Sequence, residues 1–228
     1  MLRFREIYEI WRRDNSLAQA LTESYGMLEK THGMFRKSVK LLRDGEGGET
    51  RLSIYDEDRV VNDHQMEVRK KVMRYLAITG TVDLLPGLVL IHIIIDIERI
   101  GDYTKNIAEL AMAHSGKLDC GCFETRVRDL EETVERLFSE VRPLLASSNR
   151  QVARELCDKC SWFRTGADDI LADLIKGSDE SLSRGQTAAT ALYVRYLKRV
   201  GAHLSNILSS VVNPFERIGY REERPDSA

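Results

Sequence analysis

The stretch Ile91–Leu110, IHIIIDIERIGDYTKNIAEL, sets the fold of this chain. Apolar residues occupy nearly every side of a helix drawn through it, which is typical of a central helix that touches several neighbours. Within this run Glu98, Asp102, Asn106 and Glu109 fall inside an arc of about 80°, at about 100° per residue. A buried carboxylate is costly unless a cation or hydrogen bonds compensate it, so this oxygen-bearing stripe is the first candidate for a functional site.

Helical periodicity extends outward from this stretch over most of the chain. Apolar residues recur every three to four positions and there are only four prolines, which predicts an all-α fold. The six expected helices cover about residues 17–44, 56–78, 84–113, 124–146, 152–175 and 187–212. Polar turns such as Asp44–Gly48 and Thr79–Thr81 separate them, because glycine accepts the left-handed backbone that follows a helix. The charged tail, Glu216–Ala228, is expected to be loose.

The two halves of the chain read as repeats. Arg99-Ile100-Gly101 is followed by Asn106-Ile107, and Arg199-Val200-Gly201 is followed by Asn206-Ile207 at the same spacing. We therefore predict two tandem three-helix bundles, residues 1–116 and 117–228, with Glu98 and Lys198 at equivalent positions. A glycine at the same place in both helices predicts close approach of a neighbouring helix.

The signature Glu98–Asp102 with Asn106–Glu109 resembles the helix signature of the PhoU family of phosphate-uptake regulators. The resemblance is strongest in this third helix and weak in the second half. It implies two tandem three-helix repeats, each with acidic motifs, and a regulatory protein that is not an enzyme.

In the PhoU-like interpretation Asp63 and Glu67 match the acidic motif of the second helix, and Glu98 and Asp102 match that of the third. The resemblance then implies a groove that holds iron, zinc, manganese or magnesium, since hard cations favour carboxylate oxygens. Asn106 and Glu109 are supporting candidates. The alternative is an ordinary salt-bridged helix face, because acids four residues apart are common there and basic neighbours are close.

The second repeat departs from this acidic pattern. Lys198 and Ala202 replace the two acids of the third helix, and by sequence register Cys160 and Arg164 stand where the acids of the second helix are expected. Two cations in place of acids remove the attraction for a divalent ion. Any metal is therefore expected in the first repeat only.

Composition excludes several classes of function. A net charge of -2, from 34 basic and 36 acidic residues, gives no basic field for nucleic acid. The amino terminus lacks the apolar core of a secretory signal, and the longest apolar run is too short to span a bilayer. These observations predict a cytoplasmic protein, at most peripheral at the inner face of the membrane. No nucleophile with an adjacent base, phosphate-binding glycine loop or cofactor fingerprint is present.

Three further features have two interpretations each. Cys120-Gly121-Cys122 and Cys157–Cys160 suggest a four-thiolate zinc site, but antiparallel helices would separate the two pairs by about 30 Å. This separation favours core packing for Cys160 and incidental loop thiols for the other pair.

His92 and Asp96 are either a metal pair or, as we expect, an internal hydrogen-bonded pair. The apolar face of the segment Leu2–Trp11 suits a membrane surface less well than a protein contact, since acids dilute its positive charge.

Through the resemblance, the expected function is a metal-binding adaptor that regulates phosphate uptake and phosphate-responsive signalling. Its partners would be a membrane phosphate transporter or a sensor kinase, and a homodimer is expected. The alternative is a structural helical interaction protein tied to a sodium-phosphate symporter or another ion transporter, without metal-dependent regulation.

Overall fold

The computed structural model describes residues 3–45, 50–80, 84–220 and 222, and in these ranges it is all-α, with no strand. The helices are α1 Phe4–Arg13, α2 Asn15–Asp44, α3 Thr50–Thr79, α4 Leu84–Ala113, α5 Glu124–Ser147, α6 Arg150–Lys176 and α7 Arg184–Ser209, with the short 3-10 helices η2 Gly121–Phe123 and η3 Phe215–Arg217. The predicted fold class is confirmed.

The predicted number of six helices is wrong, because the described residues contain a separate amino-terminal helix, α1. Asp14 has an extended backbone, with φ -82° and ψ 129°, and its carboxylate accepts hydrogen bonds from the backbone amides of Ser16 and Leu17. This N-cap ends α1 and starts α2 within a single residue. The chain therefore turns sharply instead of continuing as one long helix.

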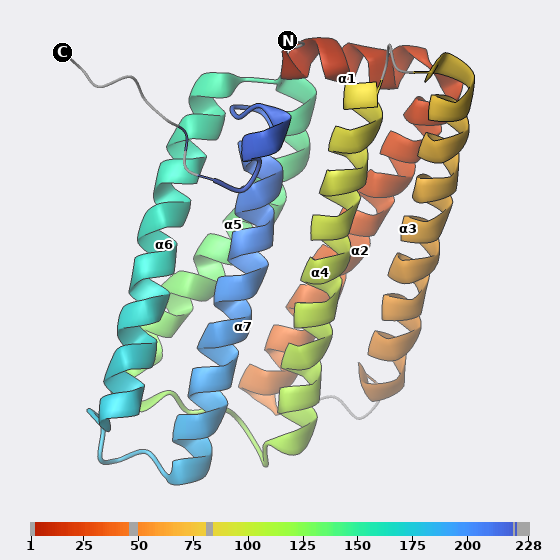
Figure 1. Ribbon diagram of the computed structural model, residues 1–228. Coiled ribbons are helices and arrows are strands. Elements are labelled where there is room, and N and C mark those ends of the chain that lie inside the picture. Colours follow the sequence, from red (N-terminus) through yellow and green to blue (C-terminus); the bar gives the residue numbers. More distant parts are fainter. Residues whose placement is uncertain (1–2, 46–49, 81–83, 221, 223–228) are drawn as a thin grey trace, which may run out of the picture.

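Helix α1 lies across one end of the bundle as a cap (Figure 1). It buries Phe4, Ile7 and Trp11, and the Trp11 indole donates a hydrogen bond of 2.9 Å to the Pro86 carbonyl at the start of α4. The apolar face of this segment thus packs on protein, as expected.

The central helices α4 and α7 lie side by side, and α3 and α6 lie at opposite edges of the molecule (Figure 1). Helices α2, α3 and α4 pack on one another, as do α5, α6 and α7, and α4 packs along α7. This grouping agrees with two units of three helices, while the domain boundary at residue 116 stays a prediction.

The two repeated glycines lie where helices approach closely. A methyl group added at Gly101 would lie 3.4 Å from the Thr31 side chain and 3.6 Å from that of Val61, while one at Gly201 would overlap the Phe163 ring. Both α4 and α7 therefore bring a backbone against neighbouring side chains, and the second contact is much tighter than the first.

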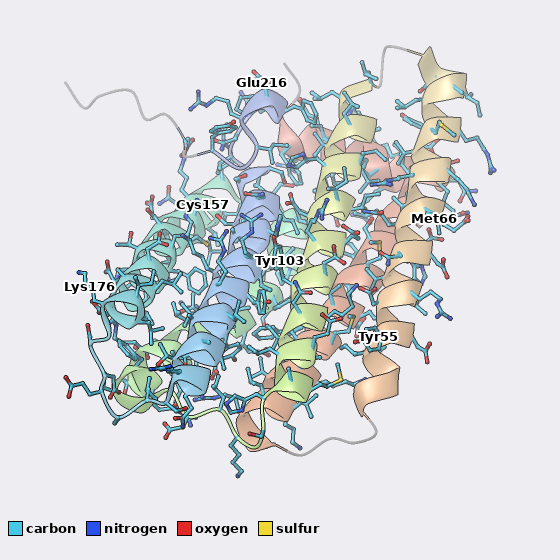
Figure 2. All side chains as sticks on the ribbon, turned by 60° about the horizontal axis from the view of Figure 1, so that its bottom comes forward. Tyr55, Met66, Tyr103, Cys157, Lys176 and Glu216 are labelled. Carbon is cyan, nitrogen blue, oxygen red and sulfur yellow. The ribbon has the colours of Figure 1, made fainter. Side chains whose placement is uncertain are left out.

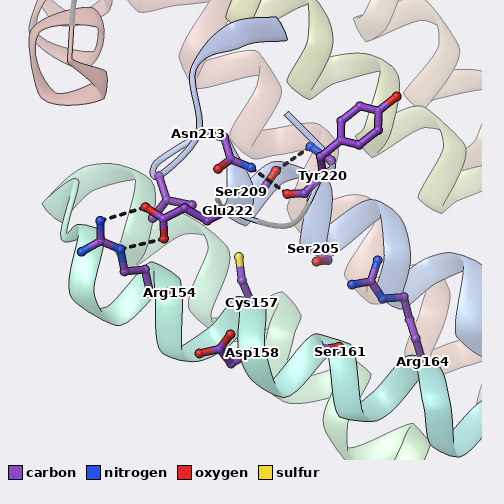
Figure 3. Close-up of a pocket in the computed structure, with 12 residues that line it drawn as sticks. Arg154, Cys157, Asp158, Ser161, Arg164, Ser205, Ser209, Asn213, Tyr220 and Glu222 are labelled. Atoms are coloured by element: carbon purple, nitrogen blue, oxygen red, sulfur yellow. Dashed lines mark hydrogen bonds and ion pairs between the residues drawn. The ribbon is translucent and has the colours of Figure 1, made fainter. Parts of the chain in front are cut away.

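The start of the tail is ordered, contrary to the expectation from its charge. The Asn213 side chain donates hydrogen bonds to the carbonyls of Arg217, at 2.9 Å, and Tyr220, at 2.7 Å. Arg154 of α6 binds Glu222 through two hydrogen bonds of 2.7 and 2.8 Å (Figure 3). The rest of the expected tail, residues 221 and 223–228, lies outside the described residues, as do parts of the turns expected at 44–48 and 79–81.

Candidate functional site

The oxygen-bearing stripe of α4 faces the seam between α3 and α4. Glu98 and Asp102 are half-buried, with 21% and 32% of their side chains exposed, and Asn106 is half-buried as well. Glu109 is exposed and accepts a hydrogen bond of 3.2 Å from the Tyr55 hydroxyl. The i, i+4 spacing thus stacks these side chains along one face of the helix, as the sequence predicts.

Lys105 lies at the centre of this seam. Its ammonium group donates hydrogen bonds of 2.8 Å to Asp58 of α3 and 3.3 Å to Asp102. Burial by itself lowers the pKa of Lys105, but the hydrogen bonds and charges of the two aspartates outweigh burial and raise it. The seam therefore contains its own cation, held between carboxylates of two helices.

Glu98 is the carboxylate of this seam that is least stabilised in its charged form. Burial raises its pKa first, and the negative charges of Asp102 and Asp58 raise it further. Arg99, at 3.8 Å from Glu98, and Arg69 act in the opposite direction but do not cancel the effect. Glu98 thus takes up a proton more readily than an ordinary glutamate does.

The acids predicted on α3 lie elsewhere. Asp63 and Glu67 are exposed, and Glu67 pairs with Lys70 on its own helix at 2.6 Å. The hydrogen bond to Lys70 lowers the pKa of Glu67. Across the described residues, no three His, Cys, Asp or Glu side chains gather in a way that could hold a metal ion.

Asp58 is the seam residue that the sequence reasoning missed. Its carboxylate is only 13% exposed, and it reaches Lys105 from α3. Helices α3 and α4 are antiparallel neighbours, and residue 58 of α3 comes opposite residue 105 of α4. Counting back from the end of α3 at Thr79 and forward from the start of α4 at Leu84 would have identified Asp58, whereas i, i+4 spacing alone gave Asp63 and Glu67.

The donor chemistry of the seam fits a hard cation, but its arrangement does not. Asp58, Glu98 and Asp102 supply carboxylate oxygens of the kind that divalent ions prefer. The Lys105 ammonium, however, already binds two of these carboxylates, and Arg99 lies 3.6 Å from Asp102. In this arrangement a metal ion would have to replace Lys105.

A second polar cluster joins the two halves of the molecule. Asp96 of α4 is buried, and its Oδ1 contacts the Nδ1 of His203 at 2.7 Å and accepts a 3.1 Å hydrogen bond from Asn206. His92 lies 3.4 Å from the other carboxylate oxygen. His92 and Asp96 thus lie close together, but the expected hydrogen bond between them is not formed. Asp96 is bonded instead by α7 side chains that were not foreseen.

Aromatic residues flank this cluster along the α4–α7 contact. Tyr103, labelled between the two helices in Figure 2, stacks on His203 with ring centres 5.7 Å apart. Arg199 donates a hydrogen bond of 3.0 Å to the Tyr103 hydroxyl. The contact between the halves is thus built from specific polar and aromatic pairs.

The cysteines do not form a shared site in the described residues. All four are free, and Cys160 is buried in the core as expected. Burial raises the pKa of Cys120 to about 11 and that of Cys157 to about 12, so neither thiol is reactive at neutral pH. Figure 3 shows Cys157 on α6 beneath the carboxyl-terminal segment.

Comparison with known proteins assigns the fold. The structure superposes on that of PhoU from Pseudomonas aeruginosa with a TM-score of 0.76 and 19% identity, covering 86% of this chain and 95% of that one. The phosphate transport system regulatory protein PhoU from Streptococcus pneumoniae gives a TM-score of 0.74 and 15% identity, over 86% and 92% of the two chains. The protein is therefore an all-α protein with the PhoU fold.

The sequence comparisons agree with the fold. Residues 25–111 match the PhoU domain family. A curated relative from Clostridium acetobutylicum, the "Phosphate-specific transport system accessory protein PhoU homolog", is 23% identical over 170 residues, which is 70% of this chain and 74% of the relative. The chain therefore contains a match to the PhoU domain over residues 25–111. None of the helices in the described ranges is long and apolar enough to cross a membrane.

Proposed function

We propose that this protein is an accessory regulator of phosphate transport that acts by binding a partner protein rather than by catalysis. The observation that carries the proposal is the match to the PhoU domain over residues 25–111, which includes the last two-thirds of α2, the whole of α3 and all but the last two residues of α4. The name of the Clostridium acetobutylicum relative, an accessory protein of a phosphate-specific transport system, supports the same function.

The proposed partner is a membrane phosphate transporter or the sensor kinase that responds to it, contacted from the cytoplasm. A homodimer remains part of this proposal. The alternative, a structural interaction protein of a sodium-phosphate symporter or another ion transporter, is favoured by one observation. Lys105 already neutralises the acid seam, so the fold needs no metal to compensate those carboxylates.

Deletion of the gene in its own organism tests the proposal. We expect increased uptake of radioactive phosphate and a loss of repression of phosphate-starvation promoters, both restored by the wild-type gene. As a matched pair, Asp102→Asn should restore less repression than Glu67→Gln, because Asp102 lies in the seam and Glu67 lies outside it. Unchanged phosphate uptake and repression in the deletion strain would exclude the proposal, and altered transport of another ion would favour the alternative.

Metal binding through Asp63, Glu67, Glu98 and Asp102 stays a prediction. Equilibrium dialysis of the purified protein against manganese, zinc or iron, followed by elemental analysis, would measure it. Binding that disappears in Glu98→Gln/Asp102→Asn would support the prediction. Binding that is unaffected by these substitutions would place the metal elsewhere.

A further inference from the structure

A cavity of about 450 Å³ lies at the end of the bundle where the two halves meet. The start of α1, the start of α4 and the carboxyl-terminal end of α7 with η3 surround it, and these segments lie near one another at the same end in Figure 1. A volume of roughly 300–1,000 Å³ is typical of pockets that bind small molecules. The cavity is separate from the α3–α4 seam.

The wall of this cavity is apolar. It is formed by side chains from both halves of the chain, among them Phe4, Ile7, Val89, Val211 and Phe215. An apolar wall gains free energy by covering apolar surface of a ligand, in proportion to the area removed from water.

The polar groups of the cavity are cationic or neutral. Arg3 and Arg5 of the amino-terminal segment, Arg150 of α6 and the hydroxyl residues Ser148 and Ser210 line it. No Asp or Glu is among its described lining residues. Guanidinium groups bind phosphate and carboxylate through paired, charge-assisted hydrogen bonds.

Two of these arginines have carboxylates nearby. Arg5 lies 3.6 Å from Glu9 in a pair that is largely exposed, and Arg150 lies 3.7 Å from Glu222 while donating a hydrogen bond of 2.8 Å to the Val212 carbonyl. The exposed Arg5–Glu9 pair is weak, and Glu222 directs its two hydrogen bonds to Arg154 and lies beyond hydrogen-bond distance from Arg150. A ligand with a negative headgroup can therefore compete for these guanidiniums.

From the combination of apolar wall and arginine rim we propose that this cavity binds a single-chain amphipathic anion, with its acyl chain on the wall and its phosphate or carboxylate headgroup on Arg3, Arg5 and Arg150. Inorganic phosphate would leave the wall exposed to water, and an uncharged chain would make no use of the guanidiniums. Because the cavity is lined by α1, α4 and the segment that follows α7, such a ligand would contact both halves at once.

Isothermal titration calorimetry of the full-length protein tests the proposal, with monodecyl phosphate below its micellar concentration as the probe. We expect binding of monodecyl phosphate, and affinities at least about tenfold weaker for inorganic phosphate and for uncharged decyl maltoside, since each lacks one half of the recognition. Equal affinity for all three compounds, or no binding of monodecyl phosphate, would overturn the proposal.

Two variants and one matched control locate the binding. Arg3→Gln/Arg5→Gln should weaken the binding of monodecyl phosphate about tenfold, and Leu85→Trp should block it by filling the cavity that Leu85 lines. The control Arg12→Gln/Arg13→Gln removes the same charge from the same helix outside the cavity and should bind as the wild type does. An equal loss of affinity in the control variant would show that net charge alone determines the binding, and this result would refute the proposed site.

Sedimentation with vesicles identifies the source of the anion. Binding to phosphatidylcholine vesicles that contain monoacyl phosphatidylglycerol but not to phosphatidylcholine vesicles alone, lost in Arg3→Gln/Arg5→Gln, would support the cavity with a single-chain membrane lipid as ligand. Binding of monodecyl phosphate without vesicle binding would support a soluble fatty-acyl anion. A third outcome would contradict the proposal: light scattering shows that Leu85→Trp breaks a dimer, and calorimetry shows no binding of monodecyl phosphate. The occupant of the cavity would then be a second copy of the chain.

Discussion

The α3–α4 seam and the α6–α7 seam have the same geometry and different chemistry. Gly101 of α4 packs on Val61 of α3, and Gly201 of α7 packs on Phe163 of α6. A residue of α4 therefore corresponds to the residue of α7 that is 100 positions later. A residue of α3 corresponds to the residue of α6 that is 102 positions later. In this register Asp58 matches Cys160 and Lys105 matches Ser205. The first seam holds an ion pair where the second holds a thiol beside a hydroxyl.

This register corrects the one expected from the sequence. Cys160 corresponds to Asp58 and not to Asp63, because Gly201 packs on Phe163 where Gly101 packs on Val61. Lys198, the counterpart of Glu98, forms an ion pair with Asp168 of α6. The two seams therefore share a glycine that packs on the neighbouring helix, and they differ in the polar groups between their helices.

The largest expected effect contrasts the two glycines. Gly201→Ala should destabilise the protein by about 2–3 kcal/mol, because the new methyl group overlaps the Phe163 ring and forces the core to move. Gly101→Ala meets ordinary contacts of 3.4 and 3.6 Å, so its gain in helix propensity should leave the stability within about 1 kcal/mol of wild type. Urea unfolding followed by circular dichroism measures both, and equal losses would break the distinction between the two contacts.

The next effect contrasts the polar pairs. Lys105→Met should cost about 1–2 kcal/mol, because it leaves the partly buried Asp58 and Asp102 without their shared cation. Ser205→Ala, at the corresponding place, should cost less than about 1 kcal/mol, since it removes a contact between neutral groups.

The same variant sharpens the question of the metal. If Lys105 occupies the place of a cation, Lys105→Met should raise the manganese bound per chain in equilibrium dialysis, because the carboxylates of Asp58 and Asp102 lose their internal partner. Manganese content unchanged from wild type would show that removing Lys105 does not create a site.

The smallest effect concerns Glu98 and pH. Burial raises its pKa in the folded state, so its protonated form favours folding at low pH, and this contribution is lost as the pH rises through the folded pKa. Glu98→Gln should therefore increase the stability at neutral pH by a fraction of a kcal/mol, with the gain vanishing in acid. Lys198→Gln, whose partner Asp168 is largely exposed, should show almost no change. Thermal unfolding between pH 4 and 8 would reveal a reversed trend if the charged form of Glu98 were the stabilised one.

Sequence patterns predicted the helices well and their mutual register poorly. The dense apolar run predicted the full extent of α4, Leu84–Ala113, because periodicity over so many turns distinguishes a helix from a strand. The amino-terminal segment was set apart from the helix expected at about 17–44, but the count of six helices left it out, and the Asp14 cap is what separates α1 from α2. Which acid of α3 meets Lys105 depends on how the hairpin closes, and spacing within one helix carries no information about that.

The Asp96 cluster was only half visible in the sequence for a related reason. His92 and Asp96 lie one turn apart on the same helix, so their proximity follows from helical geometry. His203 and Asn206 are more than 100 positions away, and only the packing of α4 on α7 brings them to the same carboxylate.

That carboxylate also limits how the two halves of the molecule can move. Sliding α7 along α4 by one residue, about 1.5 Å, would break the contacts of Asp96 with both His203 and Asn206 and leave its buried carboxylate with only His92 nearby. A small rotation about the same point keeps both contacts. Asp96 therefore favours one kind of relative motion of the two halves: α7 tilts against α4 about the Asp96 contacts and does not slide along α4.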